Sequence, residues 1–218
     1  NLSDIFERTN VMHAWGEKRY HSVDYDMKRA YGEKVYKITI NAGMTCPNRD
    51  GTLGTSGCIF CSADGSGDFA GDASLSVTAQ LEAGKAALKE KRPVRLFIAY
   101  FQAFTNTYAP VDELERIYME AALDEDVAIL SIATRPDCLG KDVLDLLEKI
   151  NRVKPVWVEL GLQTIHPQTA AWIRRGYDLP VFERAVYELR KRGITVIVHT
   201  ILALPGESKE MMIETIDY

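Results

Sequence analysis

Three cysteines in one short segment are the residues of this chain best suited to binding a metal. Cys46 begins the run Cys-Pro-Asn-Arg-Asp-Gly-Thr-Leu-Gly-Thr-Ser-Gly, and Cys58 and Cys61 follow it with two residues between them. That spacing lets the last two sulfurs reach one centre, and the glycine-rich stretch can fold Cys46 back to join them. Thiolates are soft ligands that select zinc, copper(I) or iron–sulfur clusters.

Several kinds of site are open to these thiols. A tetrahedral zinc site needs a fourth ligand, and the segment holds no other Cys and no His. A disulfide or a dithiol redox pair suits the cytosol poorly, and three buried structural thiols suit a polar, glycine-rich loop poorly. A [4Fe–4S] cluster with three cysteine ligands remains, and its fourth iron would be open to a small molecule. The spacing favours this interpretation and leaves zinc as the alternative.

The cysteine segment follows the first of five runs of apolar residues that are typical of parallel strands covered on both faces. These runs alternate with amphipathic helices, which predicts a parallel sheet with right-handed crossovers. The predicted strands are Lys34–Asn41, Val94–Phe101, Val127–Thr134, Val156–Gln163 and Thr195–Leu204. The predicted helices are Val77–Arg92, Val111–Leu123, Lys141–Arg152 and Leu179–Arg192, with a last one over Glu207–Tyr218 capped by Ser208.

This alternation predicts an α/β fold, a partial β/α barrel of the TIM type with parallel strands. Five strands are visible and a sixth is missing, so we expect a barrel cut short at its C-terminus; a five-stranded flavodoxin-like sheet is the alternative. Residues 1–30 are expected to be a lead-in that packs on the barrel, and residues 31–218 the core domain. Barrel active sites lie at the carboxyl ends of the strands, where the cysteine segment begins.

The composition excludes several classes of protein. The chain has 218 residues, of which 46% are apolar and 26% charged, and no apolar run approaches the ~20 residues of a membrane span. Its 31 acidic and 26 basic residues give a net charge of −5, which disfavours a broad surface for nucleic acid but allows a local basic groove. The start of the chain lacks the pattern of a signal peptide. A cytoplasmic protein with reduced thiols is therefore expected.

Three segments together resemble the radical S-adenosylmethionine (SAM) superfamily: the cysteine segment, Glu159-Leu-Gly-Leu-Gln163-Thr164 and His199-Thr-Ile-Leu-Ala-Leu-Pro205-Gly206-Glu207. More narrowly, the chain resembles the YtqA/YhcC-like family, which is related to the elongator catalytic subunit and to oxygen-independent coproporphyrinogen oxidase. That resemblance covers about Gly16 to the end. It rests on Lys18-Arg19-Tyr20, Cys46-Pro-Asn-Arg-Asp-Gly, Tyr100-Phe-Gln-Ala-Phe-Thr-Asn-Thr-Tyr108, Thr134-Arg-Pro-Asp137 and Ile173-Arg-Arg-Gly176.

The resemblance implies two cofactors, a [4Fe–4S] cluster and SAM. Cys46, Cys58 and Cys61 would hold the cluster, whose open iron chelates the amino and carboxylate groups of SAM. An electron from a donor such as flavodoxin or ferredoxin cleaves SAM and releases a 5′-deoxyadenosyl radical, which abstracts a hydrogen from the substrate. Cys138 lies outside the segment and is expected to be a buried structural thiol.

The resemblance also implies residues that contact SAM. Phe60 matches an aromatic beside the adenine, Gln163 a glutamine that binds the ribose, and Arg175 an arginine that pairs with the methionyl carboxylate. The Gly-Gly-Glu that usually receives the amino group is absent. In its place, Gln102 and Asn106 are expected to offer carbonyl oxygens as acceptors.

Three strand residues complete the predicted site. Thr134 ends the third predicted strand, where it is placed to contact the ribose or the methionyl carboxylate. Glu159 lies in an apolar strand, and an inward carboxylate there needs a partner. His199 is either a ribose contact or a histidine of the core. Ala203 stands where the family usually has glycine.

The resemblance implies a substrate among modified nucleosides, because elongator-like relatives modify the wobble uridine of tRNA. The first hypothesis is therefore a radical SAM enzyme that processes a modified nucleoside, in particular the side chain of a tRNA wobble uridine. The acidic balance favours a neighbouring possibility, a lyase that acts on a free modified base such as queuine. Aromatic residues Tyr100, Phe104 and Tyr108 are expected to stack on the base in either case. A non-catalytic iron–sulfur or zinc protein is the hypothesis from another class.

Overall fold

The computed structural model describes residues 15, 18 and 20–218. Its five strands form one parallel sheet in sequential order: β1 (Tyr36–Ile40), β2 (Phe97–Phe101), β3 (Val127–Thr134), β4 (Val156–Gln163) and β5 (Thr195–Thr200). The sequential order confirms the partial β/α barrel. It excludes the flavodoxin-like alternative, in which the strand order reverses within the sheet.

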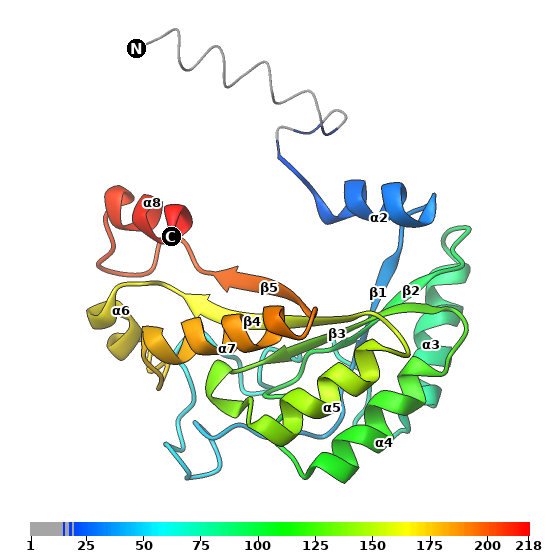
Figure 1. Cartoon of the computed structure of the whole chain (residues 1–218), viewed down its shortest axis with the longest axis horizontal. Helices are drawn as coiled ribbons and strands as arrows, with labels where there is room; N and C mark the ends of the chain where they lie inside the picture. Colours follow the sequence, from blue (N-terminus) through cyan, green and yellow to red (C-terminus); the bar gives the residue numbers. More distant parts are fainter. Residues whose placement is uncertain (1–14, 16–17, 19) are drawn as a thin grey trace, which may run out of the picture.

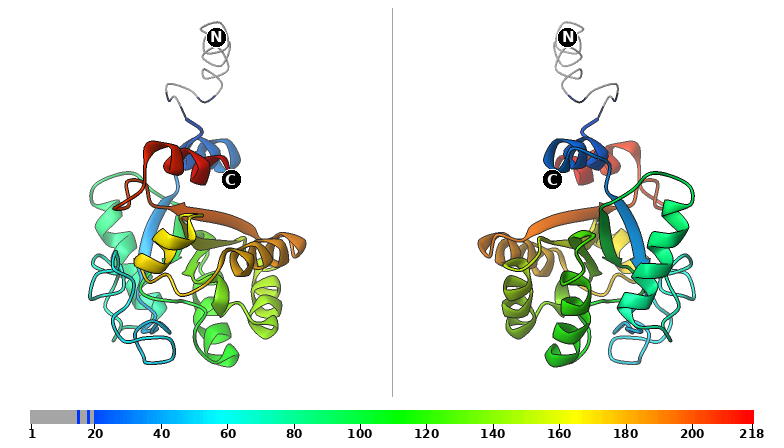
Figure 2. Two further views of the ribbon diagram at one scale, coloured as in Figure 1. Left: turned by 90° about the vertical axis from the view of Figure 1, so that its left-hand side faces the viewer. Right: turned by 90° about the vertical axis from the view of Figure 1, so that its right-hand side faces the viewer.

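Helices cover the sheet on one side and leave the other concave (Figure 1). The covering helices are α3 (Val77–Lys89), α4 (Val111–Ala122), α5 (Lys141–Asn151) and α7 (Leu179–Lys191). Three shorter helices are α2 (Val23–Tyr31), α6 (Pro167–Trp172) and α8 (Lys209–Asp217). Figure 2 shows α2 and α8 across the strands from α4 and α5, and Figure 1 shows them at opposite ends of the strands. In the part of the chain described, no helix is both long and apolar enough to cross a membrane.

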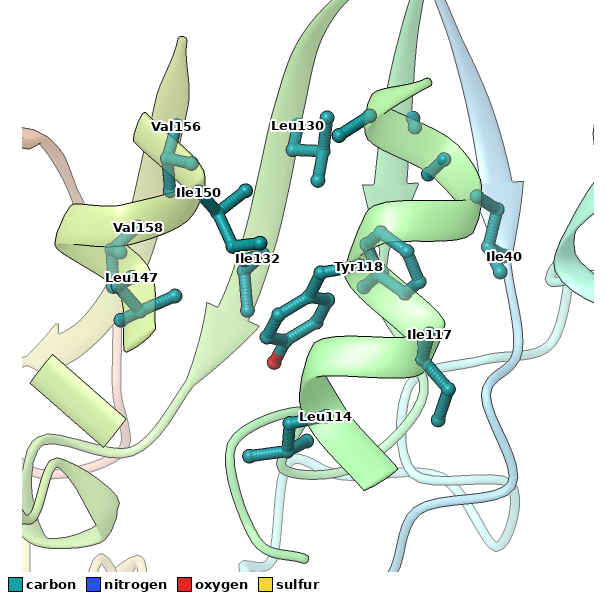
Figure 3. Close-up of a cluster of buried hydrophobic side chains, with 14 of the residues drawn as sticks. Ile40, Leu114, Ile117, Tyr118, Leu130, Ile132, Leu147, Ile150, Val156 and Val158 are labelled. Carbon is teal, nitrogen blue, oxygen red and sulfur yellow. The ribbon is translucent and has the colours of Figure 1, made fainter. Parts of the chain in front are cut away.

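The outer face of the sheet packs against α4 and α5 as a continuous apolar layer (Figure 3). Burial of such side chains is the main source of stability in a domain of this size. Its one large polar-tipped member is Tyr118, whose hydroxyl donates a hydrogen bond to the carbonyl of Asn106. The labelled residues of this layer are Ile40, Leu114, Ile117, Tyr118, Leu130, Ile132, Leu147, Ile150, Val156 and Val158.

The inner face is apolar only near the amino ends of the strands. There Ile98 and Ile129 pack with Val35 and with Met27 of α2, so α2 covers that end of the barrel. Within the predicted lead-in, residues 1–14, 16–17 and 19 lie outside the described residues, and α2 itself continues past residue 30 to Tyr31. Because side chains alternate along a strand, the next inward positions fall toward the carboxyl ends, and these are polar.

The predicted strand β5 is too long. The prediction ran to Leu204, but the strand ends at Thr200. The apolar residues that follow belong to a turn in which Ala203 has a φ of 62°, a left-handed conformation far from that of regular strands. Glycine, the residue that the resemblance implies at this position, would reach positive φ without steric cost.

Candidate functional site

A cavity of about 340 Å³ lies at the carboxyl ends of the strands. It is lined by the three cysteines of the predicted cluster segment, so the structure brings Cys46, Cys58 and Cys61 to one place. Seven other predicted residues also line it: Phe60, Gln102, Thr134, Glu159, Gln163, Arg175 and His199. A larger and mostly apolar groove between β5, α7 and α8 contains none of the predicted site residues.

Arg49 holds the cysteine segment in shape. Its guanidinium donates hydrogen bonds of 2.5–3.3 Å to the backbone carbonyls of three consecutive residues, Cys61–Ala63. Gly57 makes room for this side chain, because a Cβ at that position would lie 2.8 Å from Nε of Arg49. A larger residue at position 57 would have to displace the guanidinium, and the φ of 71° at this position also favours glycine.

Asn48 connects Cys58 to a neighbouring loop. Its side-chain amide lies 3.3 Å from the Cys58 sulfur and 2.8 Å from the carbonyl oxygen of Arg174, and it donates to both. Burial raises the pKa of the Cys58 thiol, and the hydrogen bond from Asn48 works in the opposite direction. The amide thus favours the thiolate, the form that binds metals.

The donor set fits a [4Fe–4S] cluster. Three thiols line one cavity, and Cys138 is not part of its lining, so the cavity offers three thiol ligands and no fourth. Burial, with a smaller effect of Asp137, raises the pKa of Cys138 to about 12, which marks an inert thiol. Among the described residues, no three His, Cys, Asp or Glu side chains converge on one ion position, as a zinc ion with ligands about 2.3 Å away would require.

A buried carboxylate on β4, that of Glu159, lines the same cavity as the cysteines. Glu159 is 3% exposed, and its Oε1 accepts hydrogen bonds from Nζ of Lys37, at 2.6 Å, and from the Ser131 hydroxyl. Its Oε2 lies 2.6 Å from Nε2 of His199. Burial acts to raise the pKa of Glu159, but the hydrogen bonds from His199, Lys37 and Ser131 outweigh it and lower the pKa to about 2. The expectation of a partner for this carboxylate is confirmed, and one carboxylate links β4 to β1, β3 and β5.

Aromatic rings line the cavity beside this carboxylate. Tyr100 lies with its ring centroid 3.9 Å from Nζ of Lys37, a cation–π contact, and burial together with the charge of Glu159 raises the pKa of Tyr100. Phe104 also lines the cavity, but Tyr108 does not. The Tyr108 hydroxyl lies 3.0 Å from the hydroxyl of a loop residue, Thr52. The predicted aromatic mouth therefore has two rings, not three.

Gln102 and Thr134 present acceptor atoms to the cavity. The Gln102 amide nitrogen donates to the carbonyl of Ser66, which leaves its side-chain oxygen available as an acceptor. The hydroxyls of Thr134 and Thr107 are 2.6 Å apart, and Thr107 donates to the Cys138 carbonyl at 2.7 Å. Because the Thr107 hydroxyl proton is donated to the Cys138 carbonyl, the Thr134 hydroxyl must donate to Thr107. Thr134 can therefore only accept a hydrogen bond from a ligand.

Gln163 lies on a distorted strand end. Its φ is 63°, and the pairing of β4 with β5 shifts by one residue between Gly161 and Gln163. A Cβ on Gly161 would lie 2.5 Å from the Gln163 amide nitrogen, so the glycine allows this amide to fold over the strand. The segment from Glu159 to Gln163 therefore needs its glycine for a steric reason.

Arg175 is held by backbone carbonyls. It is 3% exposed, and its guanidinium donates to Leu162 and Thr164 at 2.7 and 2.6 Å and twice to Tyr177 at 3.0–3.1 Å. Four of its five N–H groups are thus engaged. Only one N–H is left for the methionyl carboxylate with which the resemblance implied that Arg175 pairs, so a bidentate contact is not possible in this arrangement. No acidic side chain within the described residues pairs with Arg175, and burial lowers its pKa.

Asn106 does not reach the cavity. It is fully buried, and its amide nitrogen donates to the carbonyls of Phe101 and Ala133 at 3.1 and 3.0 Å. Its Oδ1 has no hydrogen-bond partner within the part of the chain described. Asn106 therefore joins the ends of β2 and β3, and the expectation that it accepts the SAM amino group is not met.

Arg135 and Tyr177 are among the cavity-lining residues that sequence reasoning missed. Arg135 pairs with Asp137 at 2.8 Å, and the Tyr177 ring lies between the guanidinium groups of Arg135 and Arg175, with its centroid 5.0 and 4.9 Å away. The signal for Arg135 was available, because it lies in the segment Thr134-Arg-Pro-Asp137. Nothing in the sequence singled out Tyr177.

Backbone strain is concentrated at this site. Among the described residues, Ser66, Phe104, Gln163, Arg174 and Ala203 are the non-glycine residues with positive φ. The first three line the cavity, and the carbonyl of Arg174 is bonded to Asn48. Such conformations cost on the order of 1–3 kcal/mol each and cluster at functional sites.

Comparisons with known proteins agree with the cysteine chemistry. Residues 40–218 match the model of the Radical SAM superfamily. The chain is 48% identical over 199 residues to the uncharacterised protein YtqA of Bacillus subtilis (strain 168) and 41% identical over 195 residues to protein YhcC of Escherichia coli (strain K12). These matches cover 91% and 88% of this chain but 62% and 61% of the relatives, so the chain spans about three-fifths of their length.

More distant proteins share parts of the sequence or the fold. A tRNA uridine(34) acetyltransferase of Methanocaldococcus jannaschii is 32% identical over 82 residues, which are 38% of this chain and 15% of that protein. The structure of an archaeal Elp3 from Methanocaldococcus infernus aligns with a TM-score of 0.60 at 18% identity, over 84% of this chain and 41% of the other. Coproporphyrinogen III oxidase (HemN) of Escherichia coli, described as a radical SAM enzyme, aligns with a TM-score of 0.55 at 17% identity, over 86% and 42%.

Proposed function

The chain belongs to the radical SAM superfamily, and from that premise we propose that it cleaves SAM reductively at the cavity of Cys46, Cys58 and Cys61. Members of this superfamily are enzymes that use a [4Fe–4S] cluster and SAM, which together supply a 5′-deoxyadenosyl radical when bound. One observation carries the proposal: three thiols, and no fourth, line a single cavity.

The residues around the thiols would position SAM in the same cavity. The Gln102 side-chain oxygen and the Thr134 hydroxyl are acceptors, which suits an ammonium or a ribose hydroxyl. Gln163 faces the same space from β4, and Phe60 offers an exposed ring for the adenine. Arg175 adds a buried positive charge without an acidic partner, which favours the methionyl carboxylate electrostatically even through a single N–H.

The polar groups deeper in the barrel would face the substrate. Glu159 is saturated by its partners, so its role in this proposal is to hold the Lys37 ammonium and the His199 imidazole in place. The side chains of Lys37 and His199 are partly exposed, at 39% and 45%. Lys37 keeps further N–H groups for a ligand, and His199 keeps its second ring nitrogen, Nδ1. Glu159 thus acts as a positioning residue for two groups that can bind substrate oxygens.

Anaerobic reconstitution with iron and sulfide tests the proposal. The parent protein is expected to take up about four iron atoms and to form 5′-deoxyadenosine from SAM with dithionite. Cys58→Ala is expected to lose the iron and the activity. Cys138→Ala is the matched control and should keep both, since that thiol lies outside the cavity lining. Iron lost from both variants alike, or zinc in the anaerobically purified protein, would contradict the assignment of ligands.

For the substrate, we propose a modified nucleoside, in particular the side chain of a tRNA wobble uridine. Two features support this choice. The partial match to a tRNA uridine(34) acetyltransferase covers 38% of the chain, and Tyr100 and Phe104 line the cavity with faces on which a base can stack, a contact worth about 1–3 kcal/mol per base. The metal-dependent chemistry and the free thiols suit the reducing cytoplasm.

A free modified base such as queuine is the competing substrate, because a net charge of −5 gives a phosphate backbone little general attraction. The two can be separated by measuring 5′-deoxyadenosine turnover with total tRNA, with free modified bases and with a porphyrinogen as the non-nucleobase control. Stimulation by tRNA alone supports the wobble nucleoside. Stimulation by the porphyrinogen alone would overturn both nucleobase proposals and leave the radical chemistry intact.

A further inference from the structure

We propose that a hollow on the outer side of the cysteine segment is the docking surface for an acidic one-electron donor protein. The proposal rests on the proposed function, because only a redox cluster at the three thiols needs such a partner. The outer hollow has a volume of about 430 Å³ and is lined by residues of two loops. They are Asn48, Leu53–Gly57, Ala171, Arg174 and Gly176.

The wall between the outer hollow and the cluster cavity is one residue thick. Gly57 lines both spaces. Asn48, which lines the hollow, donates to the Cys58 sulfur at 3.3 Å. The Cys58 sulfur also lies 3.4 Å from the carbonyl oxygen of Arg174, another lining residue. A donor seated in the hollow would therefore be separated from a cluster ligand by the two groups next to its sulfur, the Asn48 amide and the Arg174 carbonyl.

The charge of the outer hollow suits an acidic partner. Arg174 is the one charged residue in its lining, and no acidic residue lines it, although the whole chain carries a net charge of −5. Arg174 is exposed, and its guanidinium pairs with no acidic group among the described residues. A positive site at the thinnest part of the wall would attract and orient an acidic donor, since charge complementarity mainly raises the rate of association.

Exposed apolar side chains belong to the same two loops as this hollow. Leu53 lines the hollow and is 55% exposed, Trp172 follows the lining residue Ala171 and is 50% exposed, and Ile59 of the cysteine segment is 43% exposed. Ile59 is joined to the second loop by its N–H, which donates to the Ile173 carbonyl at 3.2 Å. Aromatic residues and arginine are enriched at protein interfaces, and electron-transfer complexes are among the smallest of these.

The rate of cluster reduction by two reductants tests the proposal on the reconstituted protein. The probes are a bacterial flavodoxin in its hydroquinone form, at low ionic strength, and dithionite, with bleaching of the cluster absorbance followed anaerobically. Arg174→Glu is expected to slow reduction by flavodoxin at least about tenfold, within the range of electrostatic effects on association. Arg174→Lys, which keeps the charge, is expected to stay near the parent rate. Reduction by dithionite should be unchanged in both variants.

Arg29→Glu provides the matched control, because Arg29 is an exposed arginine of α2 at the opposite end of the strands. It should not slow reduction by flavodoxin. Equal flavodoxin rates for Arg174→Glu and the parent would overturn the proposal, as would a parent that flavodoxin does not reduce. If Arg174→Glu also slowed reduction by dithionite, the role of Arg174 would be to maintain the conformation of the loop and not to bind the donor. A changed oligomeric state in Trp172→Ala would assign the hollow to contacts between copies of this chain. Failure of the proposed function can be told apart from failure of the docking proposal, because the protein would then form no 5′-deoxyadenosine even with dithionite.

Discussion

On the outer face of the sheet, side chains such as Leu130, Ile132 and Val158 pack under helices as similar apolar groups, whereas on the inner face Glu159 and Arg175 each have their own set of polar partners. The outer layer gains its stability from the total area buried, which depends little on direction. The inner groups depend on geometry, because a buried polar atom without its partner costs free energy.

The comparison teaches that the two faces should respond differently to substitution. A change on the outer face should lower stability and leave the ligand sites as they are. A change on the inner face should alter ligand binding or the pH dependence of stability, even where the fold survives. Each of the following predictions would break or sharpen this contrast.

Leu147→Ala is expected to have the largest effect on stability. Leu147 is fully buried in the outer layer, and loss of a buried leucine costs about 2–5 kcal/mol through lost contacts and a cavity. Urea unfolding measures the free energy of unfolding, and the iron content of the folded protein should stay at the parent value. Loss of iron under native conditions would break the contrast between the two faces.

Glu159 is expected to make the free energy of unfolding depend on pH in the acid range. Its pKa is about 2 in the folded protein, against 4.5 as its ordinary value, so the ionised group stabilises the fold above its unfolded pKa. That contribution, about 3 kcal/mol for a shift of this size, is lost as the pH falls from about 5 toward 2. Glu159→Gln should unfold with a weaker dependence on pH in this window. Parallel pH profiles for the two proteins would show that the carboxylate does not carry the effect.

Arg175→Gln should weaken SAM binding by about 1.5–3 kcal/mol, as expected for loss of a charged hydrogen bond in a partly dry site, or roughly 10- to 150-fold in Kd. The change also frees the carbonyls of Leu162 and Thr164 beside Gln163. Arg175→Lys should not restore affinity, because an ammonium cannot make all the hydrogen bonds to backbone carbonyls that hold the guanidinium in place. Equilibrium dialysis of the reconstituted protein measures it, and an unchanged Kd would leave Arg175 a purely structural clamp.

Ala203→Gly should have the smallest effect. The alanine has a φ of 62°, which costs a residue with a Cβ about 1–2 kcal/mol, while glycine adds about 0.4–1 kcal/mol of entropy to the unfolded chain. The net gain should therefore be on the order of 0.5 kcal/mol, measured by thermal unfolding. A loss of stability would mean that another contact, such as the one from the Ala203 N–H to the Met212 sulfur, sets this turn.

The outer face was largely predictable from the sequence because its helices and strands carry regular apolar patterns. Strands β3 and β4 begin and end where predicted. The helix α2 was not predicted, since Met27 is its one buried residue and no apolar stripe marks it. The six-residue helix α6 was missed because so short an element contains less than two turns of pattern.

The inner face was predictable only where a single residue stood out. Glu159 did, as a carboxylate in an apolar strand. Lys37 carries the same signal, a charged residue in the apolar strand β1, but was not read. The partners of Arg175 were not predictable, because backbone carbonyls have no sequence signature. Asn106 was misplaced for a related reason: its amide satisfies two strand ends that only the folded sheet brings together.

The ion pair between Lys37 and Glu159 joins residues 122 positions apart, and this separation has a consequence for synthesis. A ribosome adds about 5–20 residues per second, so Lys37 is made roughly 6–24 s before its carboxylate. The three cysteines belong to the early part of the chain, and Glu159, Arg175 and His199 belong to the late part. During translation the thiols are therefore open to iron–sulfur delivery, and to oxidants, before the far wall of their cavity exists.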